Sequence, residues 1–204
     1  MRRLVIECAS EACSVALFDD ASRIARYHEV LGRGHAERLV PAISELPGRG
    51  RADKIAVSLG PGSFTGTRIG IAAARALGLA WRVPVEGFPT LALLAAQAQA
   101  RGLGDPLGIV MNAGHGEWLV QAFGETGRPV ANHVSAKPEK AIEIVSARNI
   151  AGNRAEEFVE RRGFGEAHPI MPDTGYFPHL PRDLLTDKVS ALYARPPDAK
   201  PAKR

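Results

Sequence analysis

The chain has 204 residues, of which 45% are hydrophobic and 24% are charged. This composition is typical of a folded globular protein and excludes an intrinsically disordered chain. No apolar run approaches the ~20 residues that a membrane-spanning helix needs. The short apolar run after Arg2 and Arg3 ends at Glu7, so we interpret it as a first strand and not as a signal peptide.

Charge and cysteine content limit the possible partners and the compartment. The net charge of the chain is +4. Residues 194–204 contain four Lys/Arg residues and one acidic residue, Asp198, so this tail contributes +3 of that charge and the rest of the chain is nearly neutral. We expect this Pro-rich basic tail to be disordered and any RNA contact that it makes to be non-specific. With only Cys8 and Cys13, the sequence supports neither a disulfide framework nor a zinc site, and we expect a cytoplasmic protein.

The first half of the chain reads as an antiparallel meander joined to a parallel α/β unit. Alternating and apolar runs predict the strands, apolar residues at helical spacing predict the helices, and Asp19 and Asp20 form a hairpin turn. The predicted elements are strands at 3–8, 14–18 and 23–29, a helix at 36–46, a strand at 55–59, a helix at 66–81 and a strand at 83–85.

The second half repeats this order of elements, although its residues do not align with those of the first. The predicted elements are strands at 107–111, 117–123 and 130–134, a helix at 138–145, a strand at 148–151, a helix at 154–162, an ordered loop at 163–181 and a last helix at 182–193. A hairpin turn is expected between Asn112 and Trp118, with Trp118 in the core.

Duplicated β-β-β-α-β-α units predict an α/β protein with a two-lobed, actin-like (ribonuclease H-like, ASKHA) fold. We expect an N-terminal lobe at 1–100, a smaller C-terminal lobe at 101–193, and the disordered tail at 194–204. The junction between the lobes is expected near 97–105.

A glycine turn between the strand at 55–59 and the helix at 66–81 is the first candidate site. Its residues are Gly60, Gly62, Ser63, Thr65 and Gly66. A strand, a glycine turn and a helix start together form a typical anion site, because the first helical amides are free. No lysine stands where a Walker loop requires one. The third glycine of a dinucleotide fingerprint is one place late, and Pro61 removes an amide.

We therefore predict that these glycines shape the turn and allow close approach, and that any anion site is vestigial. An enzyme that binds ATP through residues 60–66 is the alternative. A dinucleotide site with Glu86 as ribose ligand is a weaker one.

Gly70, Ala74 and Gly78 lie four residues apart in the helix that follows. A glycine inside a helix lowers the stability of the helix by about 1 kcal/mol relative to alanine. Two glycines in one helix therefore indicate that another element packs closely against it. Tight packing on the chain's own sheet and contact with a partner subunit both fit this pattern.

The sequence offers no complete catalytic or metal-binding arrangement. No two of the six histidines are three or four residues apart, so two-histidine ligation on one helix is absent. Ser63 does not lie in a GxSxG elbow, and no base can be assigned to it. Phe64 is expected to fill the core beneath the loop, with a role as an exposed partner anchor as the alternative.

Three ordered motifs resemble the TsaB (YeaZ) family. They are GPGSFTG at 60–66 followed by RIG at 68–70, EACSVAL at 11–17, and HAERLVP at 35–41. The resemblance implies the actin-like fold and a non-catalytic role, with no cofactor, in making threonylcarbamoyladenosine in tRNA. One departure is that the first strand ends in Glu7, Cys8, Ala9 and Ser10, where the family usually has an Asp-Thr-Ser-like segment.

The resemblance also implies the partners. They are a TsaD-like transferase and a TsaE-like ATPase, with a homodimer when the chain is alone and tRNA bound only through the complex. The two helices of the first half are expected to bundle against TsaD or a second copy. The candidate interface residues are His35, Leu39, Ile43, Phe64, Arg68, Gly70, Ala74, Leu77 and Gly78.

Overall fold

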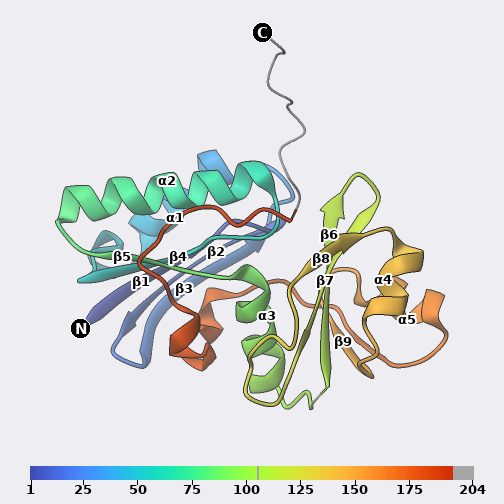
Figure 1. The fold of residues 1–204 in the computed structure, drawn as a ribbon. Helices are drawn as coiled ribbons and strands as arrows, with labels where there is room; N and C mark the ends of the chain where they lie inside the picture. Colours follow the sequence, from blue (N-terminus) through green and yellow to red (C-terminus); the bar gives the residue numbers. More distant parts are fainter. Residues whose placement is uncertain (105, 195–204) are drawn as a thin grey trace, which may run out of the picture.

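The computed structural model describes residues 1–104 and 106–194, and it contains two five-stranded sheets (Figure 1). The predicted disordered tail therefore lies outside the described residues, apart from Ala194. Within the described part of the chain, no helix is long and apolar enough to cross a membrane.

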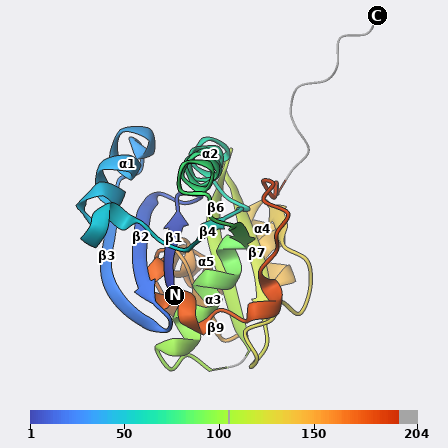
Figure 2. The same ribbon diagram turned by 90° about the vertical axis from the view of Figure 1, so that its left-hand side faces the viewer.

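The first sheet has the order β3-β2-β1-β4-β5, with β1–β3 antiparallel and β1, β4 and β5 parallel. Its strands are β1 (Arg2–Glu7), β2 (Ala12–Asp19), β3 (Ser22–Val30), β4 (Lys54–Ser58) and β5 (Val85–Phe88). Helices α1 (His35–Glu45) and α2 (Phe64–Trp81) lie side by side over one face, as Figures 1 and 2 show. A short 3₁₀ helix, η1 (Pro47–Gly50), follows α1.

The second sheet repeats this topology, because its order β8-β7-β6-β9-β10 matches that of the first strand for strand. Its elements are β6 (Leu107–Gly114), β7 (Glu117–Phe123), β8 (Val134–Ala136), α4 (Pro138–Ile144), β9 (Asn149–Ala151), α5 (Ala155–Arg162) and β10 (Glu166–His168). The predicted duplication and the two-lobed α/β fold are thus confirmed. The hairpin turn before Trp118 and the burial of this side chain are also confirmed.

Helix α3 (Thr90–Ala100), which is absent from the elements predicted from sequence, lies between the two sheets (Figure 1). Its residues from Thr90 to Ala98 are all buried, and one core cluster joins them to apolar residues of both sheets. A helix buried on every side has no polar face, so its sequence lacks the amphipathic period by which helices are recognised. The helix ends at Ala100, within the region 97–105 where the junction between the lobes is expected.

The prediction of a last helix at 182–193 is wrong. After η2 (Thr174–His179) and η3 (Arg182–Leu184), residues 185–194 form an extended segment, which we call the C-terminal strap. Thr186 and Gly87 exchange backbone hydrogen bonds of 3.0 and 2.7 Å, and Leu192 N donates to Leu59 O at 2.7 Å. The edge strand β5 offers unpaired backbone groups, and pairing with them replaces helix formation. The strand predicted at 130–134 is also misplaced, because the strand that forms in this region is β8 at 134–136.

The small residues Gly70, Ala74 and Gly78 face the chain's own sheet. All three are buried, and a methyl group on Gly78 would overlap the Val85 side chain. On Gly70 it would meet Cys8 and Val57 at 3.5 and 3.6 Å. This stripe of small residues therefore serves tight packing on the chain's own sheet, the first of the two interpretations from sequence. Small residues are needed there because larger side chains would keep α2 away from β1, β4 and β5.

We expect Ala74→Leu to lower the free energy of unfolding by ~1–3 kcal/mol, because Ala74 is fully buried against the sheet and a larger side chain overpacks it. Ala76→Leu is the matched control, since Ala76 is exposed on the same helix. Urea denaturation of both variants measures the difference. Equal stability of the two would contradict the orientation of α2.

Candidate functional site

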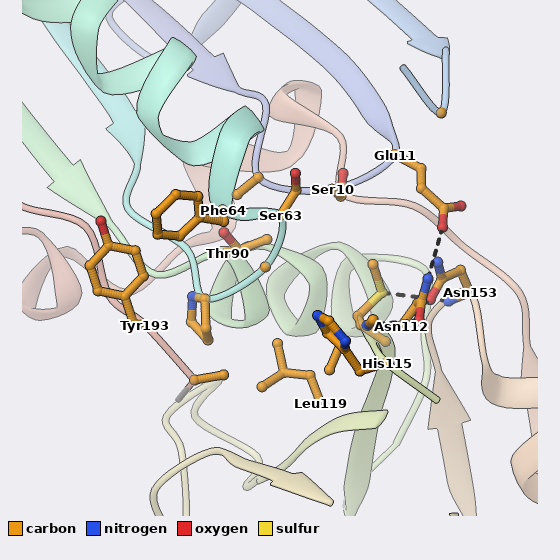
Figure 3. A pocket seen from close by; sticks show the side chains of 18 of the residues that line it. Ser10, Glu11, Ser63, Phe64, Thr90, Asn112, His115, Leu119, Asn153 and Tyr193 are labelled. Carbon is orange, nitrogen blue, oxygen red and sulfur yellow. Dashed lines mark hydrogen bonds between the residues drawn. The ribbon is translucent and has the colours of Figure 1, made fainter. Parts of the chain in front are cut away.

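A cleft with a volume of about 850 Å³ lies between the two lobes, at the start of α2 (Figure 3). The first lobe lines it with the loop after β1 and with the glycine turn, and the second lobe with the β6–β7 hairpin and Asn153. Asn112 Nδ2 donates across the cleft to Glu11 Oε1 at 3.3 Å, and Asn112 N donates to Asn153 Oδ1 at 2.9 Å. The bond to Glu11 ties the lobes together at one end of the cleft, and the bond to Asn153 holds Asn112 in place within the second lobe.

The glycine turn packs directly on the backbone of the β1–β2 loop. A methyl group on Gly62 would overlap Ala9 O, and one on Gly66 would overlap Cys8 O. Ser63 N donates to Ala9 O at 2.7 Å, and Ser63 Oγ accepts from Gly66 N at 3.2 Å as the N-cap of α2. The glycines therefore serve backbone packing, and the amides of Ser63 and Gly66 already have partners inside the chain.

Thr65 is exposed at the start of α2, next to the cleft. Glu86, the ribose ligand of the weaker alternative, forms ion pairs with Arg3 (3.4 Å) and Lys54. These two residues lie at the starts of β1 and β4, whereas the glycine turn follows the end of β4. The dinucleotide interpretation is therefore wrong, because its acidic residue lies at the opposite end of the sheet from the turn.

Glu7 lies at the end of β1, beneath the loop that lines the cleft, and its side chain is fully buried. Burial raises its pKa from 4.5 to about 7, although Ser58 and the amides of Ala9 and Ser10 favour the charged form in part. Among the described residues, no group meets either carboxylate oxygen at hydrogen-bond geometry. An ionised carboxylate is therefore poorly stabilised at this position.

Phe64, Arg68 and Tyr193 stack on one another at the mouth of the cleft. Arg68 Cζ lies 3.5 Å from the centre of the Phe64 ring, Arg68 Nε donates to Tyr193 Oη at 3.0 Å, and the two rings are 5.6 Å apart. Phe64 is 52% exposed, so the expectation that it fills the core is wrong. As the first residue of α2 it points away from the sheet, toward the C-terminal strap, as Figure 3 shows.

The outward side of α1 and α2 carries small and apolar residues. We call this surface the outer helical face; its residues are Ala36, Val40, Ile69, Ala72, Ala76 and Leu79. Val40 is 58% exposed and Leu79 is 83% exposed, while the alanines leave both helix backbones close to the surface. A groove of about 470 Å³ opens between the starts of the two helices, lined by Ala36, Thr65 and Ile69 among others.

Comparison with known proteins identifies the family. A sequence model described as "TsaD: tRNA N6-adenosine threonylcarbamoyltransferase" matches residues 26–172, which is more than half of the chain. The chain is 41% identical over 100 residues to the tRNA threonylcarbamoyladenosine biosynthesis protein TsaB of Escherichia coli, covering 47% of this chain and 43% of that protein. It is 30% identical over 155 residues to TsaB of Haemophilus influenzae, covering 68% and 65%.

A solved Pseudomonas aeruginosa protein with similarity to peptidase YeaZ shares the fold. Its TM-score is 0.77 at 26% identity, and the match covers 95% of this chain and 99% of that one. The chain belongs to the TsaB (YeaZ) family. The matched stretches span only about half to two thirds of the curated TsaB relatives.

Six of the nine interface residues expected from the TsaB resemblance are buried in the folded protein. They are His35, Leu39, Ile43, Gly70, Ala74 and Gly78. His35 Nε2 lies 3.1 Å from Ala12 O, which fixes the start of α1 on β2. These six form the inner faces of the two helices, so in the folded chain they support the outer surface and are not themselves presented to a partner.

Leu77 is half-buried, and only Phe64 and Arg68 of that set are exposed. The TsaB-family motifs thus locate the helices correctly, but the exposed residues of the outer helical face stand between or beside the residues that were predicted. Helical spacing could have found them, since each is three or four places from another.

Ser63 Oγ, the one candidate nucleophile from the sequence, is engaged as the cap of α2. Over residues 1–104 and 106–194, no three His, Cys, Asp or Glu side chains come together at metal-binding spacing.

The buried Glu7 predicts a pH dependence of stability. The folded chain keeps its proton up to about pH 7, whereas the unfolded chain releases it near 4.5. The contribution of Glu7 to the free energy of unfolding therefore falls as the pH rises between these values, by at most about 1.4 kcal/mol per pH unit.

Glu7→Gln should remove this dependence, so the variant gains stability relative to the parent between pH 5 and pH 7.5, by about 2–3 kcal/mol at most. Urea denaturation of both proteins at the two pH values gives the comparison. Parallel curves for the two proteins would show that Glu7 does not titrate in this range.

Proposed function

We propose that this TsaB-family chain is a non-catalytic subunit of a cytoplasmic complex that makes threonylcarbamoyladenosine in tRNA. In this proposal it binds and supports a TsaD-like transferase through the outer helical face. The observation that carries the proposal is this face itself: exposed Val40 and Leu79 beside alanines that allow a partner helix to approach closely.

The proposal includes three further partners, of which a second copy of the chain shares this face. A second copy of the chain would use it when TsaD is absent, so the homodimer and the TsaD complex exclude each other. A TsaE-like ATPase joins the complex, and tRNA is bound only through the complex. The engaged Ser63 and the packed glycine turn support a chain without chemistry of its own.

An enzyme that binds ATP in the cleft is the second candidate, because a cleft of about 850 Å³ lies at the start of α2. A third candidate, tRNA binding through the basic tail, concerns residues outside the described part of the chain apart from Ala194.

We expect Leu79→Asp to weaken binding to a TsaD-like protein at least tenfold, about 1.4 kcal/mol, because an unpaired charge would be buried at the interface. Val130→Asp is the matched control, since Val130 is 72% exposed in the second lobe. Size-exclusion chromatography and titration of the mixed proteins measure the effect. Failure of the parent chain to co-elute with TsaD or to change its activity would refute the proposal.

Calorimetric titration with ATP and magnesium is expected to give no micromolar binding, because the amides of Ser63 and Gly66 already have partners within the chain. Micromolar binding with turnover would favour the enzyme. Deletion of residues 194–204 tests the third candidate: loss of direct tRNA binding by the isolated chain would support it.

A further inference from the structure

Cys8 and Cys13 face each other inside the first lobe. Their Sγ atoms are 4.0 Å apart, and both residues are at most 1% exposed. Glu7 pairs with Ser14 at the end of the β1–β2 ladder, and continuing that register by one step sets Cys8 opposite Cys13. Directly opposite residues of antiparallel strands have Cα atoms about 4.5–5.5 Å apart, which lies within the range that a disulfide spans.

We propose that Cys8 and Cys13 form an oxidisable dithiol, whose conversion to a disulfide displaces the starts of α1 and α2. A disulfide requires an S–S distance of about 2.05 Å, so the two sulfurs must approach by roughly 2 Å. They are the only cysteines of the chain, so no other pair can compete within one molecule.

The backbone around the two thiols contacts both helices. Cys8 O touches Gly66 so closely that no side chain fits there, and Ala9 O accepts from Ser63 N at 2.7 Å. On the other strand, Ala12 O lies 3.1 Å from His35 Nε2 at the start of α1. Movement of either cysteine is therefore transmitted to the first turn of a helix.

The chemistry requires a two-electron oxidant, for which we name a hydroperoxide. Cys13 attacks the peroxide as the thiolate, which becomes a sulfenic acid and releases water or an alcohol. The Cys8 sulfur then attacks the Cys13 sulfur, forms the S–S bond and releases water. A hydrogen bond from Cys8 lowers the pKa of Cys13, while that bond, burial and the Glu7 carboxyl raise the pKa of Cys8.

The oxidant has a route to the thiols. Ala9, Ser10 and Glu11, the residues between the two cysteines in the loop, line the cleft. In this proposal a small peroxide enters when this short loop opens, and a dithiol reductant that enters in the same way returns two electrons and reverses the step.

The test is treatment of the folded full chain with hydrogen peroxide, followed by denaturation, alkylation and mass spectrometry. We expect a monomer that is 2 Da lighter, takes up no alkyl group, and regains two after dithiothreitol. Cys8→Ser and Cys13→Ser should give no loss of 2 Da, and melting of the reduced variants shows that they are folded. Two alkylatable thiols after excess peroxide, or only disulfide-linked dimers, would overturn the proposal.

Hydrogen exchange distinguishes a mere cross-link from a displacement of the helices. Oxidation should speed exchange of the amides of Ser63 and Gly66 at least tenfold in the parent chain and not in Cys13→Ser. Unchanged exchange in a fully oxidised chain would refute the coupling to α2.

The effect on assembly rests on the proposed function: oxidised chain should bind a TsaD-like protein at least tenfold more weakly than reduced chain. Equal binding of the two forms would refute control of assembly. If the reduced chain does not bind at all, the proposed function fails, while the mass and exchange results still decide the dithiol and its coupling to the helices.

Discussion

Close backbone contact between the glycine turn and the β1–β2 loop is the constraint on which the first lobe depends. Gly62 and Gly66 leave no space for a side chain above Ala9 O and Cys8 O, and Ser63 N donates to Ala9 O at 2.7 Å. This contact fixes the start of α2, and Gly70, Ala74 and Gly78 then keep the rest of the helix close to the sheet. A turn that could have held a phosphate is thus used to position a helix.

The consequence is that the inner and outer sides of α2 have different tasks. The inner stripe of small residues lies on β1, β4 and β5, while the C-terminal strap borders the helix through Arg68–Tyr193 and the bond from Arg75 to Val189 O at 2.5 Å. Within the part of the chain that the structure describes, Val40 of α1 and Leu79 of α2 on the outer helical face remain exposed. A rigid support below and an apolar surface above fit the docking role that we propose for this chain.

The two lobes are held together mainly by a shared apolar core, and less by the hydrogen bond across the cleft. Helix α3 contributes buried apolar residues to a core shared with both sheets, and Ser14 Oγ and Thr174 Oγ1 meet at 2.9 Å where the chain returns from the second sheet to the first. With α3 buried between the sheets and the strap paired to β5, closure of the lobes around a nucleotide would disturb a continuous core. This agrees with the scaffold role that we propose.

Local patterns in the sequence were enough to predict the duplicated topology, most strand positions and helices α1 and α2, because alternation and helical spacing report which face of an element is buried. The motifs of the TsaB family could also be read from the sequence. Tertiary structure alone decided the rest. Helix α3 is buried on every side and has no period to detect, and the strap pairs with an edge strand a hundred residues away. Which side of α2 meets the sheet, where Phe64 points, and that Cys8 lies opposite Cys13 all depend on contacts between segments that the chain brings together only when it folds.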